Sequence, residues 1–500
     1  MIIRPFVIAF FALATIAIAQ TEPSTTGPST TRSSADEQKV SRSRHEITLD
    51  GKKLAYHATA AEMAMKDESG KAKANMFFVA YDLDDARDAA TRPITFLFNG
   101  GPGAAAVWLH LGAAGPKTIE EGDGDIPVGP PYKLVDNAAT WLGSTDLVFI
   151  DPVSTGYSRP APGEKAEQFH GVHPDIESVA DFIRLYLTKH NRWASPKYLA
   201  GESYGTTRAA ALSDFLAERY GVAANGIVLI SSVLDFQSLI AGKGNDLPYE
   251  LYLPSYAAVA WYHKKLSPDL QADFNKTIDA ARKFAMEEYA PALQKGSVIA
   301  PDQRASIVKQ LAAFTGLPAE LIDRSNLRID PGLFEKRLLG DGRQVIGRFD
   351  GRITGYDPNA IGNEPGYDPS LSRYLSAYSS TFNDYVRREL KYESDLPYEV
   401  LKNVEPWSFG QEGEGYLNVA SKLQDAMVKN PRLRVMFVSG YYDLATPFFA
   451  ADYTIDRLEL NDELRKNVTH EYFPAGHMVY HHKESARKLA EDIGKFVKPE

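Results

Sequence analysis

The chain has 500 residues, of which 44% are hydrophobic and 11% aromatic, so it can bury a large core and is not disordered throughout. Its formal net charge is −10 and it contains no block of Lys and Arg, so nucleic acid is not an expected partner. It has no cysteine, which excludes disulfides, thiolate metal ligands and a cysteine nucleophile.

Residues 1–19 have the features of a signal peptide. A short start with one positive charge, at Arg4, precedes an apolar run over 6–19 that ends in Ala-Ile-Ala, a small-x-small cleavage pattern. The alternative is an uncleaved N-terminal anchor. No later segment is apolar and long enough to span a bilayer, so we expect a secreted or periplasmic protein with no stable membrane insertion after cleavage. Residues 20–43, rich in Ser, Thr and Pro, predict a disordered linker.

From Arg44 onward the pattern predicts a hairpin followed by alternating strands and helices. Segments 45–49 and 53–57 flank Asp50-Gly51, a dipeptide typical of two-residue hairpin turns. Strand patterns follow at 76–81, 94–98, 146–150, 197–200, 226–230 and 434–438, and helical patterns at 176–187, 206–212 and 485–497. This alternation predicts an α/β fold with a mainly parallel central sheet flanked by helices.

Strand patterns stop between residues 235 and 398. Helical periodicity replaces them, for example over 270–293 and 304–314, in a segment rich in Tyr and Pro. We interpret this segment as a helical cap inserted into the α/β domain. The predicted organisation is listed in chain order: the first part of the domain at 44–234, the cap insertion at 235–398 and the second part at 399–500.

Ser203 stands in Gly-Glu-Ser-Tyr-Gly, between a strand end and an alanine-rich helix. This is the nucleophile elbow of α/β-hydrolases, which exposes the serine hydroxyl at the top of the sheet. The hydroxyl needs a base, and the base needs an orienting acid; in this fold they follow in the order Asp or Glu, then His, at strand ends. Asp443 and His477 fit that order, so we predict a triad of Ser203, His477 and Asp443. Taken singly, Asp443 could be a loop cap and His477 a turn residue.

Acyl transfer also needs N–H donors for the oxyanion. The backbone N–H of Tyr204 comes with the elbow. A second donor is expected from Asn-Gly-Gly-Pro-Gly at 99–103, which follows the strand at 94–98. Glycines at this place let a backbone amide approach the substrate closely.

Taken together, these motifs resemble those of the serine carboxypeptidases. The resemblance runs over about 90–485 and is carried, in order, by Asn-Gly-Gly-Pro-Gly at 99–103, Asp-Pro-Val-x-x-Gly at 151–156, the elbow at 201–205 and Gly476-His477. It implies an α/β-hydrolase that acts on peptides, with the amides of Gly101 and Tyr204 as the oxyanion hole. It also implies that Asn99, Gly100 and Glu202 bind the C-terminal carboxylate of the substrate. The cap looks most like that of the bacterial branch of the family.

The carboxylate site makes activity depend on pH. Two facing carboxylates repel, so Glu202 can donate a hydrogen bond to the substrate only when it is protonated. Peptide cleavage is therefore expected to favour acidic pH, while ester cleavage tolerates neutral pH. Where eukaryotic members tend to carry a glutamate that supports the carboxylate site, this chain has Ala113, which weakens strict selection for a free C-terminus.

Two other functions are compatible with these residues. One is an esterase or acyltransferase that uses the same triad, and the other is a catalytically silent binding protein on the same scaffold. No cofactor and no metal are expected. His477 and His481 have the i, i+4 spacing of a metal pair, but neither a Glu motif nor a third ligand accompanies them.

Overall fold

The structure, a computed structural model, describes residues 39–49, 51–84, 91–122, 126–410 and 415–498. The predicted signal peptide and residues 20–38 of the predicted linker lie outside them. Strand β1 (Val40–Leu49) begins before the predicted start of the folded domain at Arg44, because its first residues already pair with β2 (Lys52–Lys66). The antiparallel register ends with Leu49 opposite Lys52, as a two-residue hairpin turn requires, although Asp50 itself lies outside the described residues.

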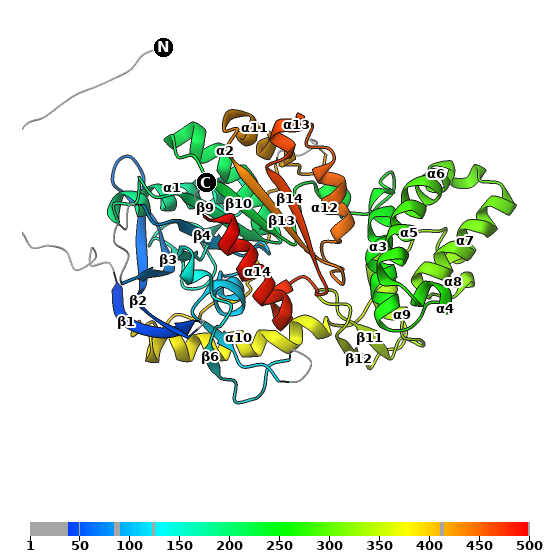
Figure 1. The fold of residues 1–500 in the computed structure, drawn as a ribbon, viewed down its shortest axis with the longest axis horizontal. Coiled ribbons are helices and arrows are strands. Elements are labelled where there is room, and N and C mark those ends of the chain that lie inside the picture. The colour runs from blue at the N-terminus through cyan, green and yellow to red at the C-terminus, as the bar shows by residue number, and fades with distance from the viewer. Residues whose placement is uncertain (1–38, 50, 85–90, 123–125, 411–414, 499–500) are drawn as a thin grey trace, which may run out of the picture. The chain divides into compact units, whose positions relative to one another are not determined.

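Ten strands of the described residues form one sheet in the order β1-β2-β3-β7-β4-β9-β10-β13-β14, with β8 beside β3 (Figure 1). The remaining strands of this sheet are β3 (Ala72–Leu83), β4 (Ile94–Phe98), β7 (Asp146–Ile150), β8 (Arg159–Pro160), β9 (Lys197–Glu202), β10 (Gly226–Ile230), β13 (Arg434–Gly440) and β14 (Val468–Phe473). Strands β7 to β14 along this order are parallel, and β1, β2 and β3 pair antiparallel at one edge. The predicted mainly parallel sheet is confirmed.

Helices cover both faces of the sheet. Phe77 and Val79 of β3 pack into a hydrophobic cluster that contains residues of α10 and α14, whereas Phe78 and Ala80 pack into a second cluster with α1, α2 and α11. The bounds of these helices are α1 (Val172–Lys189), α2 (Tyr204–Tyr220), α10 (Pro369–Arg388), α11 (Ala420–Lys429) and α14 (Lys483–Phe496). Successive strand residues point to opposite faces, so a strand buried on both faces appears in the sequence as a continuous apolar run.

A third hydrophobic cluster forms the cap, at the right of Figure 1. Its helices are α3 (Leu247–Tyr262), α4 (Pro268–Gln271), α5 (Phe274–Phe284), α6 (Ala290–Lys295), α7 (Pro301–Thr315), α8 (Ala319–Arg324) and α9 (Pro331–Arg337). The cluster also contains Tyr442 and Leu444, which follow β13, and residues of α12 (Phe448–Ile455). The cap core is therefore continuous with a loop that carries a predicted site residue, Asp443.

The predicted cap boundary at residue 398 is too late. Helix α10 lies within the predicted insertion, yet its buried residues belong to the cluster that contains β3 and α14. In Figure 1, α10 runs along the sheet domain, away from α3 to α9. The insertion also contains a hairpin of β11 (Gln344–Ile346) and β12 (Thr354–Tyr356), which the sequence does not predict. Helical periodicity predicts a buried face but not the core against which that face packs.

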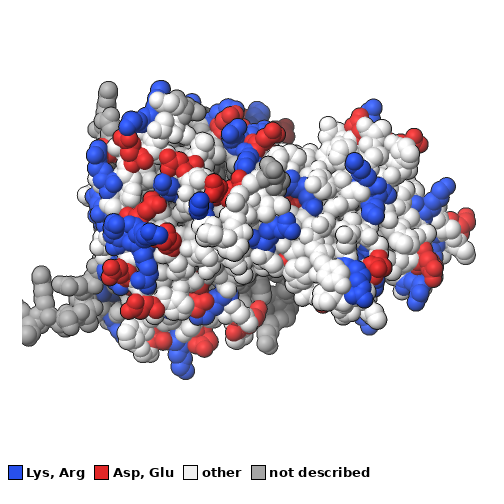
Figure 2. Space-filling model, turned by 90° about the horizontal axis from the view of Figure 1, so that it is seen from below, with Lys and Arg blue, Asp and Glu red and all other residues white. Residues whose placement is uncertain are grey.

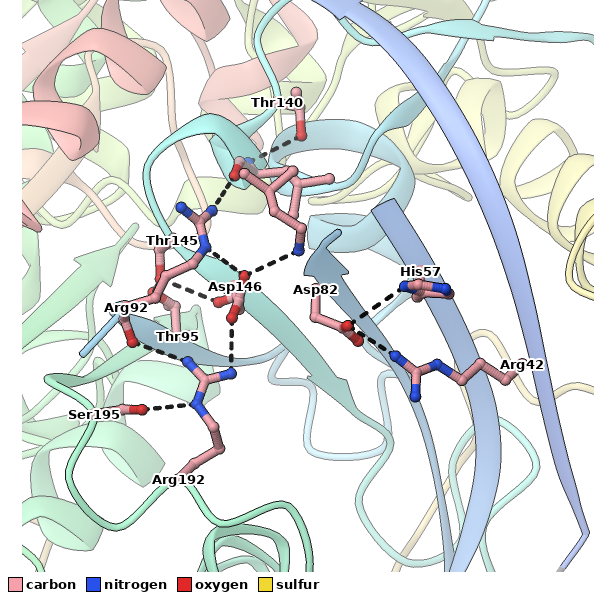
Figure 3. A network of polar contacts seen from close by, with 12 residues as sticks. Arg42, His57, Asp82, Arg92, Thr95, Thr140, Thr145, Asp146, Arg192 and Ser195 are labelled. Carbon is pink, nitrogen blue, oxygen red and sulfur yellow. Dashed lines mark hydrogen bonds and ion pairs between the residues drawn. The ribbon is translucent and has the colours of Figure 1, made fainter. Parts of the chain in front are cut away.

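A buried ionic cluster joins the starting ends of the central strands (Figure 3). Asp146, the first residue of β7, accepts hydrogen bonds from Nε of Arg92 at 2.6 Å and from Nη1 of Arg192 at 2.7 Å. Nη2 of Arg192 donates to the carbonyl of Arg92 at 2.9 Å, and its Nε donates to Ser195 Oγ at 2.7 Å. Arg92 precedes β4, and Arg192 and Ser195 precede β9. The cluster therefore lies at the edge of the sheet opposite to the strand ends that carry the predicted site.

The surface carries both signs of charge. On the face shown in Figure 2, Lys and Arg are interspersed with Asp and Glu. Within the described ranges, no helix combines the length and the apolar character that crossing a bilayer requires.

Candidate active site

Ser203 occupies a sharp turn between β9 and α2. Its φ and ψ are 60° and −130°, a region that costs a non-glycine residue roughly 1–3 kcal/mol. The flanking glycines permit the turn: a Cβ on Gly201 would collide with the carbonyl oxygen of Gly205, and a Cβ on Gly205 would lie 2.8 Å from that of Phe98. The Ser203 N–H donates to the carbonyl of Ile230 at 3.0 Å. The turn therefore has the strained backbone of a nucleophile elbow.

His477 and Asp443 lie in the loops that follow β14 and β13. Nδ1 of His477 is 2.8 Å from Oδ2 of Asp443, and the two residues are 2% and 0% exposed. The carboxylate is held by further donors: the N–H groups of Ala445 and Thr446 donate to Oδ1 at 2.7 and 3.0 Å, and the Thr446 hydroxyl donates to Oδ2 at 2.7 Å. Because Nδ1 faces Asp443, the opposite ring nitrogen, Nε2, is the one available for proton exchange.

The pKa of His477 is raised above its ordinary value. Burial acts to lower it, but the charge of Asp443 and the hydrogen bond to it raise it, and the charge of Glu202 adds to that effect. The protonated imidazole is therefore stabilised in this environment. A base in such a setting can hold the proton that a serine gives up during attack.

The predicted oxyanion donors lie beside Ser203. Tyr204 is the first residue of α2, so its N–H has no acceptor within its own helix. A Cβ on Gly100 would collide with the Tyr204 nitrogen, so the two backbones are in close contact. Gly101 follows with φ 99°, a conformation that favours glycine. Gly101, Ser203, Tyr204 and His477 line one cavity of about 180 Å³.

The predicted carboxylate-binding residues are hydrogen-bonded to each other. Nδ2 of Asn99 donates to Oε1 of Glu202 at 2.9 Å, and the N–H of Leu109 donates to Oδ1 of Asn99 at 3.0 Å. The other carboxyl oxygen of Glu202, Oε2, is buried and has no hydrogen-bond partner among the described residues. Burial raises the pKa of Glu202 to about 7. At acidic pH this carboxyl is therefore protonated.

A buried ion pair that the sequence does not predict supports the backbone of Asn99. Nη1 of Arg208, on α2, donates to the Asn99 carbonyl at 2.6 Å. Nε and Nη2 of Arg208 donate to the two carboxylate oxygens of Asp175, on α1, at 2.8 and 3.1 Å. In the sequence, Arg208 stands within an alanine-rich helix. This pattern could have indicated a buried ion pair, because arginine is rarely buried unless it is paired. The pair connects the elbow helix, α1 and the glycine-rich loop.

Most of the cavity wall is apolar and comes from segments that the sequence does not associate with the site. Its larger apolar residues are Trp108, Val233, Phe236, Leu239, Phe349, Leu371, Leu401 and Met478. Asn99, Gly100, Glu202, Thr446 and Arg348 also line it. The structure thus brings every predicted site residue except Asp443 to one cavity wall, and Asp443 lies behind His477.

A second Ser–His–Asp array is formed by residues of β13, β14 and α12. Nε2 of His470 is 2.9 Å from Oγ of Ser439, and its Nδ1 is 2.9 Å from Oδ1 of Asp452. Ser439 is 1% exposed, and Asp452 also pairs with Arg282 at 2.9 Å. None of these residues lines the cavity that contains Ser203. Without access to solvent the Ser439 hydroxyl cannot reach a substrate, so the array is structural.

No group of three or more His, Cys, Asp or Glu side chains within the described ranges is arranged to hold a metal ion. Nε2 of His481 is 2.8 Å from the Tyr378 hydroxyl, and its ring stacks on Tyr374 with 3.7 Å between centroids. Burial lowers the pKa of His481 to about 3. His481 therefore belongs to the core beneath the site and does not form a metal pair with His477.

The mostly parallel sheet with helices on both faces and a nucleophile elbow defines an α/β hydrolase. The family model for serine carboxypeptidases matches residues 65–490. The chain belongs to the serine carboxypeptidase family and is a hydrolase of that family.

Individual relatives are distant. The chain is similar to carboxypeptidase Y of Saccharomyces cerevisiae, with 25% identity over 134 residues that cover 25% of this chain and 22% of the relative. It is also similar to serine carboxypeptidase-like 44 of Arabidopsis thaliana, with 22% identity over 204 residues that cover 40% and 39% of the two chains. The matched part is thus well under two thirds of either relative. A solved prohormone-processing carboxypeptidase of Saccharomyces cerevisiae shares the fold, with a TM-score of 0.50, 17% identity and coverage of 88% and 91%.

Proposed function

We propose that this protein is a serine carboxypeptidase that removes C-terminal residues from peptides through an acyl-enzyme. One observation carries the proposal: the cavity that contains Ser203 and His477 also contains the buried Asn99–Glu202 pair, whose Oε2 has no partner among the described residues. A peptide substrate is what membership of the family implies.

In the proposed reaction, Ser203 Oγ attacks the scissile carbonyl carbon while Nε2 of His477 takes the hydroxyl proton. Asp443, held against Nδ1, stabilises the imidazolium that forms. The amides of Gly101 and Tyr204 donate to the oxyanion. His477 then gives the proton to the leaving amine, the peptide bond breaks, and the acyl ester on Ser203 is hydrolysed by a water that His477 activates.

Glu202 determines the proposed pH dependence. When protonated, its carboxyl donates a hydrogen bond to the terminal carboxylate of the peptide, next to the amide of Asn99 and the backbone of Gly100. When ionised, it repels that carboxylate. Burial raises the pKa of Glu202 to about 7, so binding of a free C-terminus is favoured below that pH and weakens above it.

An esterase on the same residues is the second candidate. It is favoured by the mainly apolar cavity wall. It is also favoured by Ala113, a buried residue at the position where the resemblance to eukaryotic family members implies a glutamate that supports the carboxylate site. An ester substrate lacks the terminal carboxylate and would not need the protonated form of Glu202.

Matched substrates separate these functions. Blocked dipeptides with a free C-terminus, the corresponding amides and the corresponding esters would be assayed at pH 5 and pH 8, with Ser203→Ala as the blank. We expect the free-acid peptides to be cleaved faster than the amides, and this preference to be larger at pH 5 than at pH 8. Equal cleavage of free and blocked peptides would favour the esterase, and a folded protein that cleaves none of them would contradict an enzymatic role.

We also propose that the protein is exported and that its cap is of the bacterial type. Export rests on the pattern of residues 1–19, which end before Gln20. N-terminal sequencing of the mature protein tests it: a chain that starts at Gln20 supports cleavage, and a chain that starts at Met1 and stays in the membrane fraction supports an anchor.

A further inference from the structure

Arg348 is the only Lys or Arg among the described residues that line the cavity with Ser203. Its side chain is exposed and forms no hydrogen bond or ion pair with the described part of the chain. Its guanidinium carbon lies over the ring of Phe349, 5.5 Å from the centroid. A cation without a hydrogen-bond acceptor or ion-pair partner among the described residues therefore lines the cavity in which the proposed substrate binds.

The backbone at Arg348 is fixed to the loops that carry the predicted triad. The Leu444 N–H, next to Asp443, donates to the Arg348 carbonyl at 3.0 Å. The His477 N–H donates to the carbonyl of Phe349 at 2.6 Å. These bonds attach the loop between β11 and β12 directly to the segments after β13 and β14. The position of Arg348 is thus set relative to the reacting groups, as a specificity residue requires.

A second arginine of the same loop shows the contrast. Arg352 donates from Nη2 to Asp350 at 2.7 Å and from Nη1 to the Pro474 carbonyl at 3.0 Å, so its guanidinium is used within the fold. Arg348 has no such acceptors in the part of the chain that the structure describes. Its charge is therefore not needed to hold the loop in place.

The charge of Arg348 acts on the carboxyl of Glu335, but this carboxyl does not neutralise it. Glu335 of α9 is buried, with Oε1 unpartnered among the described residues, and it forms no ion pair with Arg348. Burial raises the pKa of Glu335 to about 8, so this carboxyl is protonated at acidic and neutral pH. Under the conditions at which Glu202 is also neutral, Arg348 leaves the cavity wall with an uncompensated positive charge.

We propose that Arg348 selects peptides with an acidic side chain in one of the two residues that flank the scissile bond. The planar guanidinium matches a carboxylate in charge and in the spacing of its donors. The terminal carboxylate has its own proposed site at Asn99 and Glu202, so the carboxylate that pairs with Arg348 comes from a side chain. This inference rests on the proposed carboxypeptidase function and adds a substrate preference to it.

The test compares kcat/KM for four blocked dipeptides at pH 5.5, where a Glu side chain is mostly ionised. One pair has Glu or Gln on the acyl side of the scissile bond, and the other has Glu or Gln as the leaving residue. We expect the wild type to prefer Glu to Gln by about tenfold in one pair, which identifies the side that Arg348 contacts. Arg348→Gln should reduce that ratio to near one while changing the Gln peptide by less than about twofold.

Two further variants make the result specific. Arg348→Lys keeps the charge and should keep part of the preference. Arg219→Gln removes an exposed arginine near the far end of α2, about 24 Å along the helix from Ser203, and should change neither pair.

Several outcomes would overturn the proposal. They include a wild type that cleaves the Gln peptides but shows no preference for Glu, and an Arg348→Gln variant that slows Glu and Gln peptides equally. An equal loss for all four peptides that is absent from their C-terminal amides would place Arg348 on the terminal carboxylate instead. A wild type that cleaves none of the four peptides would contradict the proposed function, and this preference with it.

Discussion

Nδ2 of Asn99 donates a hydrogen bond of 2.9 Å to Oε1 of Glu202, a residue that lies 103 positions further along the chain. Strand pairing brings the two together: β4 and β9 are adjacent and parallel, and Phe98 lies opposite Gly201. The residues that follow these strand positions therefore meet at one edge of the sheet. Oε2 of Glu202 stays buried without a partner in the described part of the chain, which leaves the pair able to bind one more polar group.

Ser203 is expected to be the residue labelled by a fluorophosphonate. Ser203→Ala should abolish labelling and lower kcat for peptides by a factor on the order of 10⁶, because the nucleophile is lost. The measurement is mass spectrometry of the labelled protein together with steady-state kinetics.

Ser439→Ala is the matched control, since Ser439 also lies next to a His–Asp pair but is buried. It should keep full labelling. A label found on Ser439, or unchanged turnover in Ser203→Ala, would contradict the proposed nucleophile.

Glu202→Gln should remove the fall in peptidase activity as the pH rises through about 7. The Gln side chain is neutral at every pH and still donates a hydrogen bond, whereas the wild-type carboxyl loses its proton near that pH. The check is a pH–rate profile for a blocked dipeptide with a free C-terminus. An alkaline fall that stays in place in the variant would assign it to another group.

Glu202→Gln should also shift the acidic limb of the pH–rate profile for ester hydrolysis to lower pH. Asp443 is the main group that raises the pKa of His477 against the effect of burial, and the charge of Glu202 also raises it. Removing the Glu202 charge lowers that pKa, so neutral His477 becomes available at lower pH. The readout is the pH of half-maximal ester hydrolysis; a shift toward higher pH would show that the sign of this coupling is wrong.

Tyr480→Phe is expected to extend peptidase activity to higher pH. Burial is the main cause of the raised pKa of Glu202. The charge of His477 opposes it, and so does the Tyr480 hydroxyl, which lies near this carboxyl without forming a hydrogen bond in the structure and favours its ionised form. Without the hydroxyl the pKa rises further. The ring of Tyr480 packs against Gly112, where a Cβ would collide with it, and Phe keeps this packing. An unchanged or more acidic midpoint for the free-acid peptide would refute the role of the hydroxyl.

Arg208→Met should destabilise the fold strongly, because it leaves the carboxylate of Asp175 buried without its partner. Breaking such a pair costs about 3–5 kcal/mol of unfolding free energy. Urea denaturation measures the loss. Arg219→Met, on the same helix but exposed, serves as the control and should change stability by less than about 0.5 kcal/mol. Equal stability of the two variants would mean that the Arg208–Asp175 pair does not support the helix.

The predicted site residues that the structure brings to one cavity follow strand ends or belong to the turn after a strand. The elbow around Ser203 combines a glycine pattern with an apolar strand before it and a helix after it, all within about ten residues, so its geometry is local. Asp443 and His477 are found in a similar way, because each lies in the loop a few residues after a strand, β13 and β14 respectively. The strand bounds at 94–98, 146–150 and 226–230 agree with the structure, since short apolar runs between turn signals are typical of strands buried on both faces.

The elements that sequence patterns did not locate depend on contacts between distant segments. The periodicity of α10 predicts a helix with one apolar face, but the same face could pack on the cap or on the sheet, and only the tertiary structure decides for the sheet. No local sequence pattern marks Arg348 as a cavity residue. Its position depends on hydrogen bonds between its loop and the distant backbone N–H groups of Leu444 and His477. Arg208 needs Asp175, on another helix, before it can be recognised as a buried ion pair.

By itself, then, the sequence determined the fold class and the residues that follow the strand ends, since glycine turns, strand runs and helix periods are set by neighbours in the chain. The tertiary structure alone decided the cavity wall. Among the described residues it also decided that Oε2 of Glu202 has no hydrogen-bond partner and that Arg348 has no ion-pair partner. These depend on how helices and loops far apart in the sequence pack against one another, which local patterns do not encode.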